Sequence, residues 1–543
     1  MAADLIVHNG RVFSSGRPGA LTDATATAVA VGGGRILAVG DEREAREWAS
    51  PATTVFDAAG GLVMPGFNDA HMHLRHGAIG LDRLDLFGLT TLDAVQSAIA
   101  GYAAARPDQA WVTGRGWIYA AFPRGMPTRE QLDAVVPDRP AYFECFDGHS
   151  GWANTRALEA AGITAETSDP PDGRIARDEA GRPTGALMER AAELVESLVP
   201  LPGDDRMRAL TEEALRRAAA LGITAVQDAW GRPDELRQLR SLSAENRLPI
   251  RFRLAFEMLP RLGRAGHAER LDKFEALRAQ SPEGPRLRTG ILKSFLDGVV
   301  EAHTAYLLEP YPGTDSRGDR RWEDDELRDA VAVAHARGWQ VELHAIGDAA
   351  VRQALDAYEA LGPGEAAARR HRVEHIETVH PTDLPRFAEL GVVASMQPMH
   401  AIPEASQVDV WRGYLDPAVA ATGWPLRSLS ASGVVLAFGS DWPVVPIDPM
   451  LEINAAVRRR TPSGEPEEGY LPAEALSVAD ALNAATWGSA YAEHAEAERG
   501  YLAPGMFADL IVLDRDLLRE DASAIMGTQV RLTVVDGEVV HSA

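Results

Sequence analysis

The sequence predicts an α/β protein built around a barrel of parallel strands, and three observations predict this fold. Strand-like and helix-like segments alternate through the middle of the chain, and both chain ends carry short strand-like segments. A stretch of about residues 115–200 is rich in proline and glycine and only weakly periodic. Alternating strands and helices favour βαβ units, and eight such units close a (β/α)8 barrel of the TIM type. We therefore expect this barrel, a small β-sandwich formed by both chain ends, and an insertion at about 115–200.

The two chain ends contain hairpin-like strands. Asn9-Gly10 separates two apolar segments, and a glycine triplet at 32–34 separates two more. Near the C-terminus, residues 509–513 are a strand candidate, and Asp536-Gly537 lies between two others. Asn-Gly and Asp-Gly between apolar runs are typical of tight hairpins. Since neither end has enough strands for a stable sheet, residues 1–63 and 494–543 are expected to combine into one β-sandwich domain.

The middle of the chain, residues 64–493, is expected to form the barrel. Apolar residues recur at helical spacing over residues 205–221 and end at Gly222, and helices at 326–337 and 349–361 end in the same way. Strand candidates begin near residues 62, 141, 223, 252, 291, 340, 372, 392 and 434. These are nine candidates for eight places, so we assign the strand near residue 141 to the insertion.

Composition limits the classes of partner. The 543 residues include 54 Lys or Arg and 79 Asp or Glu, a net charge of −25, which argues against nucleic acid and anionic membrane. The single cysteine excludes a disulfide framework and a cysteine-rich zinc site. No apolar run reaches the ~18 residues of a membrane span, and no signal peptide is visible. We expect a cytoplasmic protein that acts on a small molecule; a homodimer is the commonest assembly for such a protein.

Histidines and an aspartate lie where strands are expected to end. His71 and His73 follow an apolar run, and residues i and i+2 of a strand point the same way, so both imidazoles can bind one metal. His344, His375 and Asp441 each end another strand candidate. The active sites of such barrels are built at the carboxyl ends of the strands. A lone His-x-His pair is typical of a protein surface, but the five positions together predict a metal site.

Lysine is almost absent from the chain. Lys273 and Lys293 are the only lysines among 54 basic residues. Lysine, unlike arginine, can lose its proton and act as a nucleophile. Lys273 lies on a helix-like segment and is expected to be solvated. For Lys293, on an apolar strand candidate, two interpretations remain open: an ion pair at the barrel rim, or an amine that captures CO₂ as a metal-bridging carbamate.

At these motifs the chain resembles the amidohydrolase superfamily, from Gly61 to about Leu513. The motifs that carry the resemblance are MPGFNDAHMH (64–73), Lys293, His344, His375 and GSDW (439–442). Within the superfamily the chain is similar to the branch of N-substituted formamide deformylases and related metal-dependent hydrolases. The segments that carry this closer similarity are GRGW (114–117), DGHS (147–150), LDGVVEAHTA (296–305), ELHAIGD (342–348) and RVEH (372–375).

The resemblance implies a binuclear metal centre and a hydrolytic reaction. The implied ligands are His71, His73 and Asp441 for one divalent ion, His344 and His375 for a second, and carboxylated Lys293 as the bridge. Zinc is the expected metal. A metal-bound hydroxide would attack the substrate carbonyl, with Asp441 as general base and then general acid. The implied enzyme is an amidohydrolase acting on carbon–nitrogen bonds other than peptide bonds, in an amide, an N-substituted formamide or a cyclic amide.

Two other functions stay open. A deaminase or an esterase would use the same site on a different bond. A non-enzymatic binding protein on a barrel that has lost its activity ranks last, because none of the ligand positions is missing from the chain.

Further candidates lie in the loops expected around the barrel mouth. His149 and His303 can each act as a catalytic residue that donates a hydrogen bond to the substrate carbonyl or the tetrahedral oxygen, or be a structural loop residue. Trp117 and Trp442 are the candidate substrate-binding residues, with simple packing as the alternative. His400, just after residues 396–399, can reach the barrel mouth through its loop, but a solvated position at the rim is the favoured interpretation.

Overall fold

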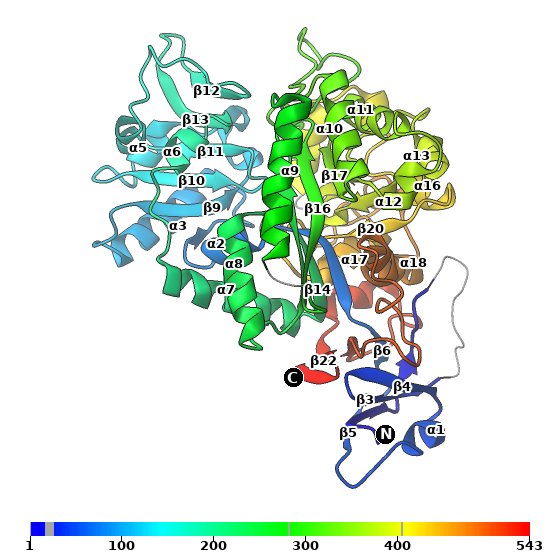
Figure 1. Ribbon diagram of the computed structural model, residues 1–543. Coiled ribbons are helices and arrows are strands. Elements are labelled where there is room, and N and C mark those ends of the chain that lie inside the picture. The colour runs from blue at the N-terminus through cyan, green and yellow to red at the C-terminus, as the bar shows by residue number, and fades with distance from the viewer. Residues whose placement is uncertain (1, 17–25, 281–282, 403–404) are drawn as a thin grey trace.

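The computed structural model describes residues 2–16, 26–280, 283–402 and 405–543, and it confirms the predicted α/β barrel (Figure 1). Eight strands form one sheet in the order β20-β19-β18-β17-β16-β15-β14-β7, and each neighbouring pair in this order is parallel. The strands are β7 (Phe67–Met72), β14 (Ile223–Gly231), β15 (Arg251–Glu257), β16 (Leu287–Phe295), β17 (Gln340–Ala345), β18 (Arg372–His375), β19 (Val393–Met396) and β20 (Leu436–Phe438).

Helices follow the barrel strands along the chain and surround the sheet (Figure 1). The three helices expected from periodicity are confirmed as α7, α10 and α11. The helices of this region are α2 (Leu74–Gly80), α7 (Asp204–Ala220), α8 (Pro233–Ala244), α9 (Gly263–Ala279), α10 (Asp324–Ala336), α11 (Asp348–Glu359), α12 (Glu365–Arg369), α13 (Leu384–Leu390), α14 (Ala405–Gly413), α15 (Pro417–Ala420), α16 (Leu426–Ala431), α17 (Pro449–Arg458), α18 (Val478–Asn483) and α19 (Ser489–Ala492). Short turns add η3 (Pro398–Ala401), η4 (Pro472–Glu474), η5 (Ala484–Gly488) and η6 (Ala522–Gly527).

Both chain ends form two small sheets that pack on one another, at the end of the molecule where both termini lie (Figure 1). One sheet contains β4 (Arg35–Gly40), β3 (Ala28–Gly32), β1 (Leu5–His8) and β5 (Thr54–Asp57), and α1 (Glu42–Arg46) packs on its face. The other contains β2 (Arg11–Val12), β6 (Leu62–Pro65), β21 (Leu510–Leu513), β22 (Val530–Val535) and β23 (Glu538–Ser542). Buried valines and leucines of both sheets share one core, which confirms the expected β-sandwich.

Two expectations about the N-terminal strands are wrong. Asn9-Gly10 does not make a hairpin, because β1 and β2 belong to different sheets and the chain crosses the sandwich between them. The apolar run at residues 62–67 is not the first barrel strand: β6 pairs with β21 in the sandwich, and the barrel strand β7 begins at Phe67. His71 therefore lies within β7, and His73 is the first residue after it. The hairpins at the glycine triplet and at Asp536-Gly537 are confirmed.

The insertion, which comes between β7 and β14 along the chain, forms a sheet separate from the barrel (Figure 1). The sheet begins at Leu84, earlier than the expected residue 115, because β8 has two residues and Gly114 and Gly116 weaken the strand pattern of β9. Its strands, in sheet order, are β12 (Gly173–Arg177), β13 (Pro183–Glu189), β11 (Ser150–Ala153), β10 (Ala141–Cys145), β9 (Val112–Trp117) and β8 (Leu84–Asp85). Its helices are α3 (Leu92–Ala105), η1 (Tyr119–Ala121), η2 (Pro123–Gly125), α4 (Arg129–Asp133), α5 (Thr155–Ala160) and α6 (Glu193–Glu196).

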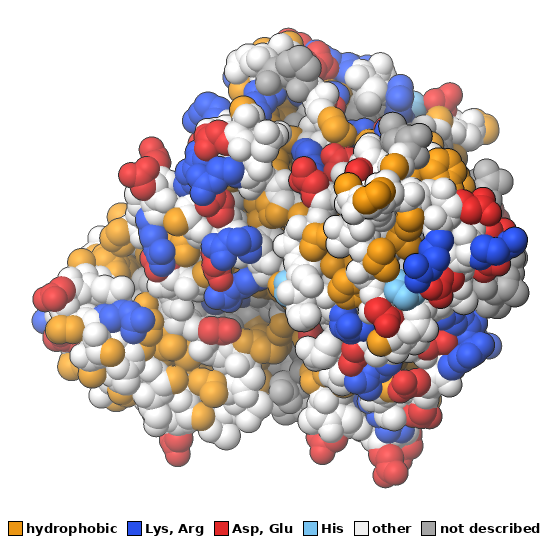
Figure 2. Space-filling model, turned by 90° about the horizontal axis from the view of Figure 1, so that it is seen from below, with side chains coloured by type: hydrophobic (Ala, Val, Ile, Leu, Met, Phe, Trp, Pro, Cys, Tyr) orange, Lys and Arg blue, Asp and Glu red, His pale blue; other side chains and the backbone are white. Residues whose placement is uncertain are grey.

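The surface carries charges of both signs. Acidic and basic side chains are interspersed on the face shown in Figure 2, with hydrophobic side chains between them. Within the described part of the chain, no helix is both long enough and apolar enough to span a membrane.

A buried ion pair joins the barrel to the sandwich. Arg251 of β15 is 1% exposed, and its Nε and Nη2 donate to the two carboxylate oxygens of Asp509 at 2.6 and 2.9 Å. Its Nη2 also donates to Asp536 at 3.1 Å. Removing one partner of such a pair leaves an unpaired charge in a place that water does not reach.

Replacing Arg251 tests this connection. Arg251→Met leaves the buried carboxylate of Asp509 without its cationic partner. The substitution is expected to lower the free energy of unfolding by about 3–5 kcal/mol. Arg264→Met is the matched control, because Arg264 pairs with Asp329 on the surface, where such pairs contribute about 0–1 kcal/mol. Urea unfolding of both variants gives the comparison, and equal losses would contradict a special role for the buried pair.

Candidate metal centre and active site

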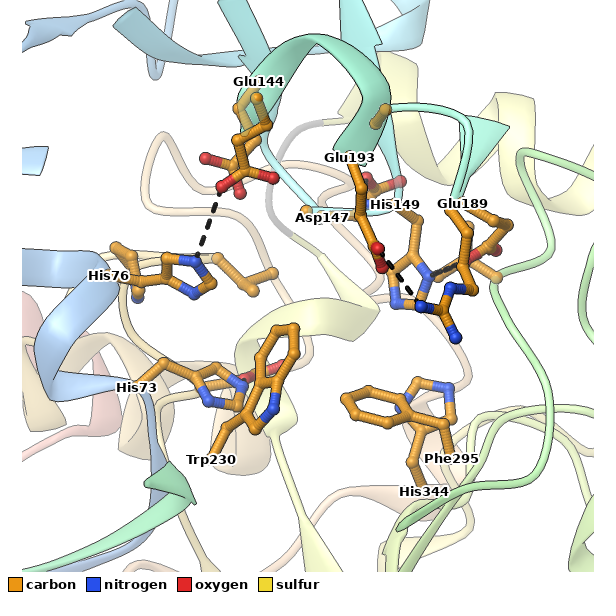
Figure 3. Close-up of a pocket in the computed structure, with 18 of the residues that line it drawn as sticks. His73, His76, Glu144, Asp147, His149, Glu189, Glu193, Trp230, Phe295 and His344 are labelled. Carbon is orange, nitrogen blue, oxygen red and sulfur yellow. Dashed lines mark hydrogen bonds and ion pairs between the residues drawn. The ribbon is translucent and has the colours of Figure 1, made fainter. Parts of the chain in front are cut away.

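A cavity of about 590 Å³ opens at the carboxyl ends of the barrel strands, and residues of both the barrel and the insertion line it. Figure 3 shows His73 and Trp230 on one side of this space and His149 and His344 on the other. A concave site with converging polar groups at this end of a barrel is the usual place for catalysis.

The first expected ligand group is brought together at the floor of the cavity. Oδ1 of Asp441 lies 2.9 Å from Nε2 of His73 and 3.5 Å from Nε2 of His71. Burial lowers the pKa of His71 well below its usual value, which keeps this imidazole neutral and able to donate a lone pair. Burial raises the pKa of Asp441, but the adjacent imidazoles outweigh this effect and hold it well below the usual range.

Backbone contacts between the first and last barrel strands bring Asp441 next to His71 and His73. The amide of Asp441 donates to the carbonyl of His71 at 2.6 Å, and the amide of His73 donates to the carbonyl of Trp442 at 2.7 Å. A Cβ atom at Gly439 would lie 2.3 Å from the His71 nitrogen, so only glycine permits so close an approach. The GSDW segment therefore closes the barrel as well as supplying Asp441.

Lys293 lies inside the ligand group. Its Nζ is 3.3 Å from Nε2 of His71, and its side chain is fully buried. Burial lowers the pKa of this amine to about 8. No carboxylate of the described residues lies within 4.0 Å of its Nζ, so an ion pair at the rim, one of the two interpretations left open, is not what the structure contains. Lys273 is instead an exposed residue paired with Glu269, as expected.

His344 and His375 lie next to one another on neighbouring strands. Their ring centroids are 4.5 Å apart, and Nδ1 of His375 is 3.9 Å from Oδ2 of Asp441. Nε2 of His344 faces the carbonyl of Gly298 at 3.3 Å. Burial lowers the pKa of both histidines well below the usual value. Both are therefore neutral imidazoles at the mouth of the barrel.

His400 joins this group, although it was expected to be a solvated residue of the rim. Its side chain is 10% exposed, and its Nε2 lies 3.5 Å from Oδ2 of Asp441. The ring of His400 stacks parallel to that of His375. The less favoured of the two interpretations, in which the loop brings His400 to the barrel mouth, is the one that the structure contains. The direction of a side chain in a short turn depends on tertiary packing, which the sequence pattern does not report.

The residues present fit a divalent metal. Nδ1 of His375 and Nε2 of His400 are buried and have no hydrogen-bond partner among the described residues. Unpartnered buried polar atoms are costly, so a cluster of them calls for a bound group. Imidazole nitrogens and a carboxylate suit zinc and several related ions.

Buried charges inside the barrel orient His71. Nδ1 of His71 lies 2.6 Å from Oε2 of Glu374, so the carboxylate holds the proton on Nδ1 and leaves Nε2 free for the site. Arg372 forms ion pairs with Glu374, at 3.1 Å, and with Glu342. Sequence reasoning missed this support, although Arg372 and Glu374 alternate along a strand just before His375.

A carboxylate of the insertion ties His149 to the barrel. Nδ1 of His149 lies 3.0 Å from Oε2 of Glu189, and Thr304 Oγ1 donates to the same carboxylate at 2.6 Å (Figure 3). Arg321 forms an ion pair with it. Burial lowers the pKa of His149, but the charge of Glu189 outweighs this and raises it. Nothing in the sequence pointed to Glu189, whose partners in the barrel are more than a hundred residues away.

The two expected substrate-binding tryptophans lie elsewhere. Trp117 is fully buried in the core of the insertion, where its Nε1 donates to the carbonyl of Phe143. Trp442 packs against Gly77 of α2. Neither is among the described residues that line the cavity. Both positions match the packing alternative, because a large aromatic side chain fills whichever core lies nearest to it.

His303 also lies outside the described lining of the cavity. Its ring stacks on Tyr311 with centroids 4.7 Å apart and meets the ring of Tyr414 at 4.4 Å. The aromatic surface of the cavity comes instead from Trp230 and Phe295, whose rings meet edge to face. Of the two loop histidines, only His149 faces the site.

The fold, the cavity and the metal-ligating groups together define a metal-dependent hydrolase. A family model described as "Amidohydrolase family" matches residues 54–541. The chain therefore belongs to the amidohydrolase family, as its motifs indicated.

Two relatives match over nearly their whole length. The N-substituted formamide deformylase of Arthrobacter pascens is 32% identical, covering 98% of this chain and 97% of that protein. The putative amidohydrolase YtcJ of Bacillus subtilis (strain 168) is 31% identical, covering 99% of both. Among solved structures, an uncharacterized metal-dependent hydrolase from Pyrococcus furiosus is 29% identical with a TM-score of 0.70, covering 95% of this chain and all of that one. One from Pyrococcus horikoshii OT3 is 27% identical with a TM-score of 0.72, covering 96% and 99%.

Proposed function

We propose that this protein hydrolyses a carbon–nitrogen bond other than a peptide bond, in an amide, an N-substituted formamide or a cyclic amide. The observation that carries the proposal is the meeting of Asp441 with His71, His73 and Lys293 on the floor of a cavity large enough for a small molecule. The full-length similarity to an N-substituted formamide deformylase supports this choice of bond.

The proposed centre binds two divalent ions, with zinc as the expected metal. The proposed ligands are His71, His73 and Asp441 for the first ion, His344 and His375 for the second, and Lys293, as a carbamate, for both. When bound, the ions supply Lewis-acid activation of a water and of the substrate carbonyl.

Lys293 is suited to form the carbamate. With its pKa lowered to about 8, part of the amine is neutral near physiological pH. The Nζ lone pair then forms a bond to the carbon of CO₂, and one N–H proton passes to solvent. The product is an anion with two oxygens, placed beside Nε2 of His71.

Asp441 is the proposed general base and acid. Because its pKa is held well below the usual range, the carboxylate is ionised, which is the protonation state that a general base needs. It takes the proton from the attacking water and returns it to the leaving nitrogen, which departs as a neutral amine.

The insertion supplies the remaining proposed groups. His149, oriented by Glu189 through Nδ1, is placed to donate from Nε2 to the oxygen of the substrate carbonyl. Trp230 and Phe295 form the aromatic wall on which the substituent of the amide rests.

Turnover of model substrates tests this function. The zinc-loaded chain is expected to hydrolyse N-substituted formamides, linear amides or cyclic amides, to lose activity when a chelator removes the metal, and to regain it with zinc. Asp441→Asn removes the base and is expected to lower kcat by about 10²–10⁴-fold. Asp315→Asn, at an exposed acid far from the lining, is the matched control. Undiminished turnover in Asp441→Asn would contradict the mechanism. A chain that leaves these amides intact but releases ammonia from an amino-substituted heterocycle, or an alcohol from an ester, would indicate a deaminase or an esterase.

The two lysines offer a direct test of the carbamate. In protein prepared with zinc and ¹³C-labelled bicarbonate, the wild-type chain is expected to show a carbamate carbon resonance by NMR. Lys293→Arg should abolish this resonance, because the guanidinium stays charged and does not attack CO₂. Lys273→Arg, at the only other lysine of the sequence, should keep it. A resonance that survives in Lys293→Arg would refute the assignment.

A further inference from the structure

The seventh barrel strand delivers a side chain to the metal centre that the proposed ligand set does not use. His400 lies on η3, directly after β19. Its backbone is held in place by two hydrogen bonds: its own amide donates to the carbonyl of Gln397 at 3.0 Å, and the amide of Met399 donates to the buried carboxylate of Glu452 at 3.2 Å. The ring of His400 therefore occupies a defined position at the mouth of the barrel.

The position of that ring is suited to metal binding. The ligand atoms of His375, His400 and Asp441 all lie within 4.8 Å of one another. The rings of His375 and His400 stack at 5.8 Å with an angle of 11° between their planes. Nε2 of His400 is buried without a hydrogen-bond partner, as is Nδ1 of His375. Two imidazole nitrogens and a carboxylate oxygen are thus close enough together to bind one ion.

A carboxylate, that of Glu377, lies on the side of the His400 ring that faces away from the candidate metal site. Nδ1 of His400 lies 3.9 Å from Oε1 of Glu377, which is 6% exposed. The other oxygen of Glu377 accepts a hydrogen bond from Trp411 at 2.8 Å, so the carboxylate is fixed. His71 also has a carboxylate beside its Nδ1, that of Glu374, but at hydrogen-bond distance, 2.6 Å. Histidines that ligate metals commonly have such a carboxylate partner on the other nitrogen.

We propose that His400 is a further ligand of the metal centre, binding through Nε2 the second divalent ion, for which His344 and His375 are the ligands already proposed. This inference rests on the proposed metal centre, and it adds a seventh ligand that ties the loop after β19 to the site. The first ion, held by His71 and His73, does not depend on His400. Loss of His400 should therefore weaken one metal site and spare the other.

Zinc titration of the metal-free, full-length chain tests the inference without any substrate. The wild-type chain is expected to bind two zinc ions, and His400→Ala is expected to bind the first with unchanged affinity and the second at least about tenfold more weakly. His375→Ala should lose the same second ion. His541→Ala, at a histidine of β23 in the sandwich, is the matched control and should bind both ions as the wild type does.

The outcomes separate this inference from the proposed function. Two ions bound with wild-type affinity in His400→Ala, with a loss in His375→Ala, would overturn the role of His400 alone. No zinc bound by the wild-type chain would overturn the metal centre as well. His400→Gln is a second variant should His400→Ala not fold, since it keeps a polar side chain of similar length. Its cobalt form should show a changed absorption spectrum, and an unchanged spectrum would count against the ligand.

Discussion

Closure of the barrel between its first and last strands is the constraint on which the site depends. Two backbone hydrogen bonds join the chain after β20 to β7, and they are possible only because Gly439 has no side chain to collide with His71. Asp441 holds a left-handed backbone conformation, with φ of 55°, which costs about 1–3 kcal/mol for a residue other than glycine. The same backbone contacts that hold this strained residue direct its carboxylate at two imidazoles. The geometry of the candidate ligands therefore depends on closure of the barrel.

Buried charge is the second requirement of this architecture. Arg372, Glu342 and Glu374 lie fully inside the barrel, where isolated charges are strongly disfavoured. Arg372 forms ion pairs with both glutamates, and the carboxylate of Glu374 is hydrogen-bonded to Nδ1 of His71. The interior beneath the site is therefore polar. This pattern is understandable if its role is to fix the tautomer and direction of a ligand rather than to add stability.

Much of the barrel and of the metal site followed from the sequence, because both depend on local patterns. His344 and Asp441 were found since each follows an apolar strand candidate, and the ends of parallel strands converge. Features that depend on long-range packing were not predictable. The continuous apolar run before His71 concealed a change of sheet at Gly66, and Trp117 and Trp442 were indistinguishable from pocket residues until their cores were known. A solvated position was favoured for His400 because no periodicity reports how a short turn directs its side chain.

The number of divalent ions held by each folded chain tests most directly the claim that these side chains form a binuclear centre. Elemental analysis of the wild-type protein, after loading with zinc and bicarbonate and removal of excess metal, gives that number. Two equivalents per chain are predicted, since the ligand atoms around Asp441 fall into two groups that share this carboxylate. One equivalent would contradict the binuclear arrangement, and none would contradict the metal centre itself.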